Sequence, residues 1–204
     1  MKADDLRKRI DSDYNGTMYR CKLFRLAENH EMITSDIEAY DFDRIVGSLC
    51  KREKLSSADA LFVGRKNVLF IEFKTGFDTK NYNVKSETSR VFSELLRKSL
   101  RLKACESLIV LEKVLCNGDE TDFNKIYVSV IDGRRDPLGA RSEVLSKKAE
   151  QNNAVSEKQR IEEELRKKSI LIYRRRVDNK NIMFDGVEVI YDTEFDVEIS
   201  RIAV

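Results

Sequence analysis

The sequence predicts an α/β fold, and three observations lead to this class. Two short apolar strands form a hairpin at residues 59–74, a helical pattern spans residues 85–115, and a β-branched strand follows at residues 125–131. Strand and helix periods that alternate along a chain are typical of α/β domains. At 204 residues, of which 41% are hydrophobic and 36% charged, the chain can bury one well-formed core.

Residues 1–34 are expected to form an N-terminal extension. Residues 1–13 are charged and predict a frayed helix, and the polar run at residues 14–17 predicts a turn. Residues 18–26 are apolar enough for a strand or a short helix, and the pattern does not separate these two readings.

A helix that passes into a strand is expected next. Ser35 and Glu38 have the spacing of a capping box, in which a serine caps the helix and a glutamate three residues later reaches back to it. Apolar residues continue at helical spacing, and the pattern becomes strand-like by about Gly47.

The hairpin is the most informative segment. Its turn is centred on residues 65–66, flanked by the turn formers Gly64 and Asn67. In this register three pairs of residues lie opposite each other: Val63 and Val68, Leu61 and Phe70, and Asp59 and Glu72. The second strand is apolar on both faces and charged only at its C-terminal end, which is typical of a central strand.

Asp59 and Glu72 form a candidate cation site. Two carboxylates directly opposite on a hairpin repel each other, and a bound cation removes that cost. Hard divalent ions such as Mg²⁺ take oxygen ligands of this kind. Lys74 leaves the same face of its strand as Glu72, because strand side chains alternate, so an ammonium is expected nearby. The competing interpretation is a surface ion-pair cluster, which would require polar residues at all outward positions.

A polar loop is expected at residues 75–84, followed by the helix at residues 85–115. The apolar residues of this helix recur at steps of three and four: Val91, Leu95, Leu102, Cys105 and Ile109. Asn117 and Gly118 tolerate a left-handed backbone and are expected to end it.

The last third of the chain is expected to form an extension with strands. Residues 132–139 read as a loop and residues 141–169 as a polar helix. Two strands are expected at residues 169–177 and 182–190, around a polar turn, with a possible third at residues 195–204.

The hairpin resembles the catalytic motif of the PD-(D/E)xK nuclease superfamily, which includes restriction endonucleases, phage exonucleases, Holliday-junction resolvases and repair nucleases. That motif has an acid at the start of one strand, here Asp59, and an acid, any residue and a lysine on the next, here Glu72, Phe73 and Lys74. The proline usually written before the first acid is Ala58 in this chain.

The resemblance also implies the fold and the domain organisation. The order of elements from Ser35 onward matches the αβββαβ core of this superfamily, the restriction endonuclease-like fold with a mixed central sheet. This core is assigned to residues 35–136, between the extension at residues 1–34 and a C-terminal helix and β-hairpin extension at residues 137–204, expected to pack on the same domain.

The chemistry implied by the resemblance is hydrolysis of DNA phosphodiester bonds, with RNA as an open alternative. Mg²⁺, or Mn²⁺, would be held by Asp59, Glu72 and the main-chain carbonyl of Phe73, polarising the phosphate and activating a water. Lys74 would orient or help deprotonate that water. Many relatives carry a further acid on the first helix, for which Glu38 is the best match, with its capping role an equal explanation. Its rivals are Glu28 and Glu31.

Basic residues of the helix after the hairpin are candidates for contact with a phosphate backbone. They are Lys85, Arg90, Arg97 and Arg101. A solvated helix face with acid–base pairs at four-residue spacing explains the same pattern equally well. Arg134–Arg135 and Arg174–Arg176 are further candidates.

Composition excludes several other classes of protein. The net charge is only +2, so any basic surface for nucleic acid must be local. The four cysteines show no CxxC spacing and there is one histidine, which does not make a zinc set. No segment approaches the length of a membrane span, no signal peptide is evident, and a cytoplasmic location is expected.

Two other functions remain open from the sequence. One is a non-catalytic nucleic-acid-binding or assembly subunit that keeps the nuclease-like fold, and the other is a structural domain with a coincidental Glu-x-Lys. A homodimer and a subunit of a larger complex are both compatible with the chain.

Overall fold

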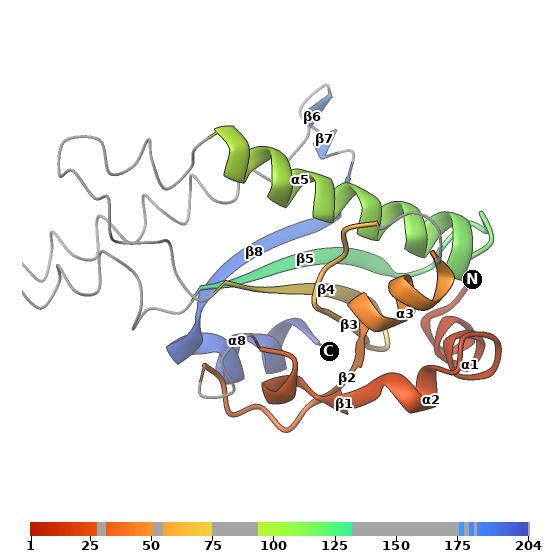
Figure 1. The fold of residues 1–204 in the computed structure, drawn as a ribbon, viewed down its shortest axis with the longest axis horizontal. Coiled ribbons are helices and arrows are strands. Elements are labelled where there is room, and N and C mark those ends of the chain that lie inside the picture. The colour runs from red at the N-terminus through yellow and green to blue at the C-terminus, as the bar shows by residue number, and fades with distance from the viewer. Residues whose placement is uncertain are drawn as a thin grey trace, which may run out of the picture.

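The protein is an α/β structure built on a six-stranded open, mixed sheet (Figure 1). This computed structural model describes residues 1–27, 32–50, 55–74, 94–131, 176–177, 180–181 and 183–203. The strand order is β1-β2-β3-β4-β5-β8. Strands β1 to β4 pair antiparallel, whereas β4–β5 and β5–β8 pair parallel. The predicted α/β class and its mixed sheet are therefore confirmed.

The strands of the sheet vary in length, and the longest two are adjacent at its centre. Their bounds are β1 (Arg20–Lys22), β2 (Glu38–Asp41), β3 (Ala60–Val63), β4 (Asn67–Lys74), β5 (Asn124–Ile131) and β8 (Gly186–Tyr191). A separate two-stranded sheet consists of β6 (Arg176–Val177) and β7 (Lys180–Asn181).

Helices cover both faces of the sheet and bury a core on each (Figure 1). One face is covered by α1 (Ala3–Asp13), α3 (Phe42–Leu49) and α5 (Glu94–Ile109), which continues into the π-helical turn η4 (Val110–Leu115). The opposite face is covered by α8 (Phe195–Ile202). Three short elements complete the described chain: α2 (Gly16–Tyr19), η1 (Leu23–Arg25) and η5 (Asp192–Glu194).

The predicted hairpin register is confirmed. Leu61 pairs with Phe70 and Val63 with Val68, and the Gly64 N–H donates to the Asn67 carbonyl at 2.8 Å across the turn. The ladder ends at the pair Ala60–Ile71, so Asp59 and Glu72 follow at the next position.

The predicted helix after Ser35 is wrong. Glu38–Asp41 forms β2, and the helix α3 begins only at Phe42, capped by the Asp41 carboxylate, which accepts from the Arg44 N–H at 3.0 Å. The Ser35 hydroxyl instead accepts from the Ile37 N–H. Pairing with β1 and β3 on its two sides satisfies the backbone of β2, and this tertiary pairing outweighs a local capping pattern.

The possible C-terminal strand at residues 195–204 is also wrong, because residues 195–202 form α8. Phe195, Ile199 and Ile202 are spaced by four and three residues, and their side chains pack against the sheet. The N-terminal helix is confirmed as α1, while the ambiguous residues 18–26 contain both a helical turn and a strand. The predicted helix at residues 141–169 lies outside the described residues.

Within the apolar stripe predicted for the long helix, Leu102 and Ile109 do not face the sheet, and the side chains of Val91 and Leu95 lie outside the described residues. Leu102 and Ile109 are 50% and 55% exposed, whereas Leu100, Ala104 and Ser107 are buried. The face of α5 that meets the sheet therefore carries small and polar residues among its apolar ones.

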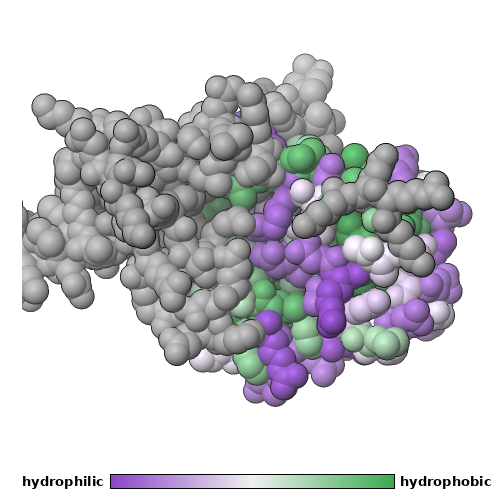
Figure 2. All heavy atoms as spheres, viewed as in Figure 1, coloured by the Kyte–Doolittle hydropathy of each residue, from purple (hydrophilic) through white to green (hydrophobic). Residues whose placement is uncertain are grey.

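Hydrophilic residues cover most of the described surface on the face shown in Figure 2, with smaller hydrophobic areas between them. No helix in the described part of the chain is long and apolar enough to cross a bilayer.

Candidate cation site at the ends of β3 and β4

Asp59 lies immediately before β3 and is held from three sides. Its main-chain carbonyl accepts from the Phe42 N–H at 3.2 Å. One carboxylate oxygen, Oδ2, accepts from the Phe73 N–H at 2.6 Å, and the other, Oδ1, lies 3.5 Å from the ammonium of Lys103. The hydrogen bond from Phe73 therefore sets the direction of the Asp59 carboxylate relative to β4.

Glu72 is a fully buried acid on the central strand β4, with 0% of its surface exposed. Both of its carboxylate oxygens accept from Lys103 Nζ, at 2.9 and 3.1 Å. A carboxylate removed from water in this way is strongly destabilising unless a counter-charge and hydrogen bonds accompany it.

Lys103 of α5 supplies that counter-charge. Its ammonium contacts both Glu72 and Asp59, so the two carboxylates share one cation. The exposed fraction is 25% for the Lys103 side chain and 15% for that of Asp59, whereas Glu72 is closed off from solvent. The group therefore reaches solvent on the side of Lys103 and Asp59.

A third acid, Asp43 of α3, adds negative charge to the group. Its carboxylate accepts from the Ser57 hydroxyl, two residues before Asp59. Burial by itself lowers the pKa of Lys103, but the charges of Glu72, Asp59 and Asp43 outweigh burial and raise this pKa to about 12. Lys103 is therefore a protonated, positively charged group at neutral pH.

The segment before β3 is tied to α5 as well. The Ser107 hydroxyl accepts from the Ala58 N–H at 2.8 Å and donates to the Lys103 carbonyl at 2.7 Å. The Glu106 carboxylate accepts from the Ser56 N–H. These bonds fix α5, and with it Lys103, against the start of β3.

The structure thus brings Asp59 and Glu72 together, with Phe73 beside them. The N–H and C=O of a strand residue point toward the same neighbouring strand, so the Phe73 carbonyl faces the Asp59 side of β4. Lys74 lies two residues beyond Glu72 in β4, and only its backbone is among the described residues.

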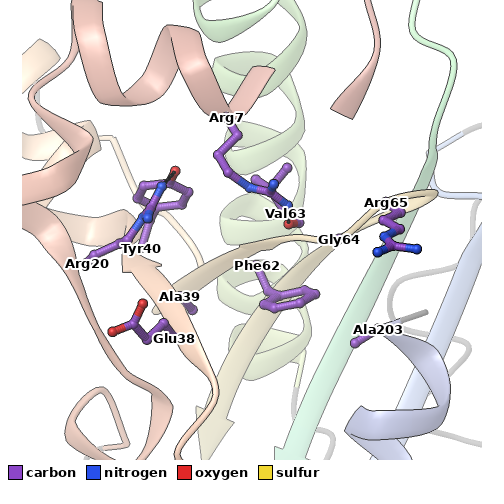
Figure 3. Close-up of a pocket in the computed structure, with 10 residues that line it drawn as sticks. All are labelled: Arg7, Arg20, Glu38, Ala39, Tyr40, Phe62, Val63, Gly64, Arg65 and Ala203. Atoms are coloured by element: carbon purple, nitrogen blue, oxygen red, sulfur yellow. Dashed lines mark hydrogen bonds between the residues drawn. The ribbon is translucent and has the colours of Figure 1, made fainter. Parts of the chain in front are cut away.

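Glu38 is not part of this group. The pairing of Tyr40 with Leu61 and Asp41 with Ala60 places Glu38 near Val63, at the turn end of β3, away from Asp59. There it lines an open pocket of about 520 Å³ with Arg7, Arg20 and Arg65 (Figure 3). The further-acid role proposed for Glu38 therefore lacks the geometry it requires. Glu28 and Glu31 lie outside the described residues.

Two of the arginines that line this pocket, Arg7 and Arg20, already have partners within the protein. Arg7 donates to the Val63 carbonyl at 2.6 Å, and Arg20 contacts both Asp11 and the Tyr40 hydroxyl. Figure 3 shows the Phe62 ring between Glu38 and Arg65 among the lining residues. These contacts serve to join α1, β1 and β2 to the hairpin.

Most of the residues predicted to contact nucleic acid lie outside the described residues. Lys85, Arg90 and the arginine pair 134–135 are outside the described residues, and only the backbone of Arg97 is described. Arg101 lies on α5, two residues before Lys103, and is partly exposed.

Sequence reasoning missed Lys103 and Asp43. Lys103 lies three residues after Leu100 and four before Ser107, both of them buried. Residues at i−3 and i+4 share a helix face with residue i, so a lysine at this spacing from an apolar and a small residue was the available signal.

The donor atoms fit a hard divalent ion, because Asp59 and Glu72 offer carboxylate oxygens that already share the Lys103 ammonium as a cation. Among the described residues, no set of three or more His, Cys, Asp or Glu is close enough to hold a metal ion. The protein would thus provide two carboxylates and a main-chain carbonyl, with waters completing the shell, as is usual for Mg²⁺.

Comparison of the chain with protein-family models, with curated proteins and with solved structures found no match.

Proposed function

We propose that this protein is a metal-dependent nuclease of the PD-(D/E)xK type, which hydrolyses phosphodiester bonds of DNA. The single observation that carries the proposal is that the carboxylates of Asp59 and Glu72, from adjacent strands, contact one and the same cationic group. Acids so placed at the ends of β3 and β4 are what the motif Asp59, Glu72-Phe73-Lys74 requires.

The order of elements supports the same proposal. Strands β2, β3 and β4 pair antiparallel in sequence order, and β5 pairs parallel to β4 after the crossover through α5. If α1 takes the place of the first helix, which the sequence placed after Ser35, this order fits an αβββαβ core with β1 and α3 as additional elements.

The proposed roles follow from the contacts of each residue. Asp59 and Glu72 bind the ion, with the Phe73 carbonyl as a further oxygen ligand, and the Phe73 N–H holds Asp59 in orientation. A bound Mg²⁺ would polarise the phosphate and lower the pKa of an attacking water. Lys74, at the end of β4, is proposed to orient that water and to offset negative charge on the phosphate.

The test is cleavage of linear, circular, single-stranded and branched DNA with Mg²⁺, with Mn²⁺ and with EDTA. Asp59→Asn, Glu72→Gln and Lys74→Ala should each lower the rate by about a hundredfold or more, the scale on which loss of one charge-stabilising group acts. Asp36→Asn is the matched control, because this exposed acid pairs only with Lys22 in the described structure. Equal rates in Asp59→Asn and the wild type would refute the proposal.

A second candidate is a non-catalytic nucleic-acid-binding subunit that keeps this fold. The observation in its favour is that the Lys103 ammonium contacts both acids and offsets part of their negative charge. This alternative predicts DNA binding that is unaffected by EDTA and no cutting of any substrate.

A further inference from the structure

The ammonium of Lys103 lies between the carboxylates of Asp59 and Glu72. It lies 2.9 and 3.1 Å from the two oxygens of Glu72 and 3.5 Å from Oδ1 of Asp59. The second oxygen of Asp59 is engaged by the Phe73 N–H. The oxygens directed at Lys103 are therefore those that the proposed nuclease would use for its ion.

The two cations exclude each other at this position. Mg²⁺ binds oxygen at about 2.0–2.1 Å, so an ion ligated by Glu72 and Asp59 Oδ1 would lie against the Lys103 nitrogen. Two positive charges at such a distance repel strongly, most of all beside a buried group where the effective dielectric constant is low.

We infer that Lys103 is a built-in counter-ion of the Asp59–Glu72 pair and that a divalent cation binds by displacing its ammonium. The inference rests on the proposed function and names how the same site is regulated: Lys103 competes with the divalent cation for the carboxylates of Asp59 and Glu72.

The surroundings allow this exchange without movement of the helix. The side chains of Ser107 and Glu106 hold α5 to the segment before β3 by accepting from the Ala58 and Ser56 N–H groups, and these bonds do not involve the Lys103 side chain. The Lys103 side chain is one quarter exposed and its four-carbon stem is flexible, so the ammonium can swing toward solvent. Asp59 keeps its orientation, since Phe73 holds the other oxygen.

The first test measures the affinity for Mn²⁺, used alone as the probe, by isothermal titration calorimetry. Lys103→Met removes the competing charge and should bind Mn²⁺ at least about tenfold more tightly than the wild type. Lys103→Arg keeps a cation between the acids and should bind no more tightly than the wild type. Lys125→Met is the control for a general change in charge, because Lys125 pairs with Glu112 instead, and its affinity should stay within about twofold.

The second test follows Lys103 itself in the wild-type protein. Displacement frees the amine from both acids, so the rate at which acetic anhydride labels Lys103, read by mass spectrometry, should rise severalfold when Mn²⁺ is added. Labelling of Lys125 should not change. This measurement uses only the wild-type protein. It therefore shows whether Mn²⁺ displaces the Lys103 ammonium even if Lys103→Met does not fold.

The outcomes separate this inference from the proposed function. If the wild type cleaves DNA and binds Mn²⁺, but labelling of Lys103 is constant and Lys103→Met binds no more tightly, the exchange is overturned and the nuclease stands. If the wild type and all variants neither bind Mn²⁺ nor cleave DNA, both are overturned.

Discussion

The Ser107 hydroxyl accepts a hydrogen bond from the Ala58 N–H at 2.8 Å, joining α5 to the residue before Asp59. Ser107 is buried, and its hydroxyl also donates to the Lys103 carbonyl. One small side chain thus sets the spacing between the helix that carries Lys103 and the strand that follows Asp59. It is a positioning residue for the candidate site.

Replacing Ser107 by alanine should lower the free energy of unfolding by about 1–3 kcal/mol, because the Ala58 N–H loses its buried acceptor. Urea denaturation measures the change. Ser200→Ala is the control: this exposed hydroxyl donates to the Asp196 carbonyl within α8, and its loss should cost about 0.5 kcal/mol or less. A Ser107→Ala protein as stable as the wild type would show that the bond does not hold the segment.

Loss of Lys103 should be costly in the absence of metal. Lys103→Met removes the ammonium that contacts both oxygens of the fully buried Glu72 carboxylate, and removing one partner of a buried pair typically costs about 3–5 kcal/mol. The double variant Lys103→Met, Glu72→Gln should recover much of this, and a double-mutant cycle from urea denaturation measures the coupling. The exposed pair of Arg201 and Glu198 is the control, for which the same cycle should give less than about 1 kcal/mol.

Stability should also fall at strongly alkaline pH through Lys103. Its pKa is raised from 10.5 to about 12 in the folded protein, since the attraction of Glu72, Asp59 and Asp43 outweighs burial. A group with a raised folded pKa stabilises fully below its unfolded pKa, and this contribution is lost as pH rises from 10.5 through about 12.

The raised pKa of Lys103 corresponds to a contribution of about 2 kcal/mol to the free energy of unfolding. Other residues titrate in the same window, so the measurement is the difference in unfolding free energy between wild type and Lys103→Met at pH 9 and at pH 12. That difference should shrink at the higher pH. A constant difference would mean that folding does not raise the pKa of Lys103.

Gly64 is expected to tolerate no side chain. A Cβ at this position would lie 2.6 Å from the Ala203 carbonyl oxygen and 2.9 Å from the Asn67 oxygen, both of them backbone atoms. Gly64→Ala should therefore lower the melting temperature by several degrees. Gly47 offers the opposite case, since nothing lies within 4 Å of its added Cβ in α3. Gly47→Ala should raise stability by about 0.5–1 kcal/mol, because alanine favours the helix.

Cys116 should resist alkylation in the folded protein. Burial raises the pKa of its thiol to about 11, and its side chain is inaccessible, whereas Cys50 and Cys105 are partly exposed. Iodoacetamide at pH 8 should label Cys50 and Cys105 first and reach Cys116 only in urea, as read by mass spectrometry. Equal labelling of all three without denaturant would contradict the buried placement.

The register of the hairpin could be predicted from nearby residues alone. The turn formers Gly64 and Asn67, with alternating apolar residues, determine a register that the structure reproduces from Val63–Val68 to Ala60–Ile71. This register follows from the chain itself, since strands joined by a tight turn have few ways to pair. It was sufficient to place Asp59 and Glu72 side by side.

Two segments show where local pattern fails. Residues 38–41 carry a helix-start pattern yet form a strand, because β1 and β3 supply hydrogen-bond partners from distant parts of the chain. Residues 195–202 looked like a strand, but the four- and three-residue spacing of Phe195, Ile199 and Ile202 fits a helix packed on the sheet.

By itself, the sequence determined the α/β class, the hairpin and its pair of acids, because these depend on neighbours within a few residues. Only the tertiary structure decided which cation those acids meet. Lys103 is 44 positions from Asp59 and 31 from Glu72 along the chain. It reaches them because Ala104 and Ser107 let α5 approach the sheet closely, and a buried carboxylate at Glu72 requires a positive charge in contact.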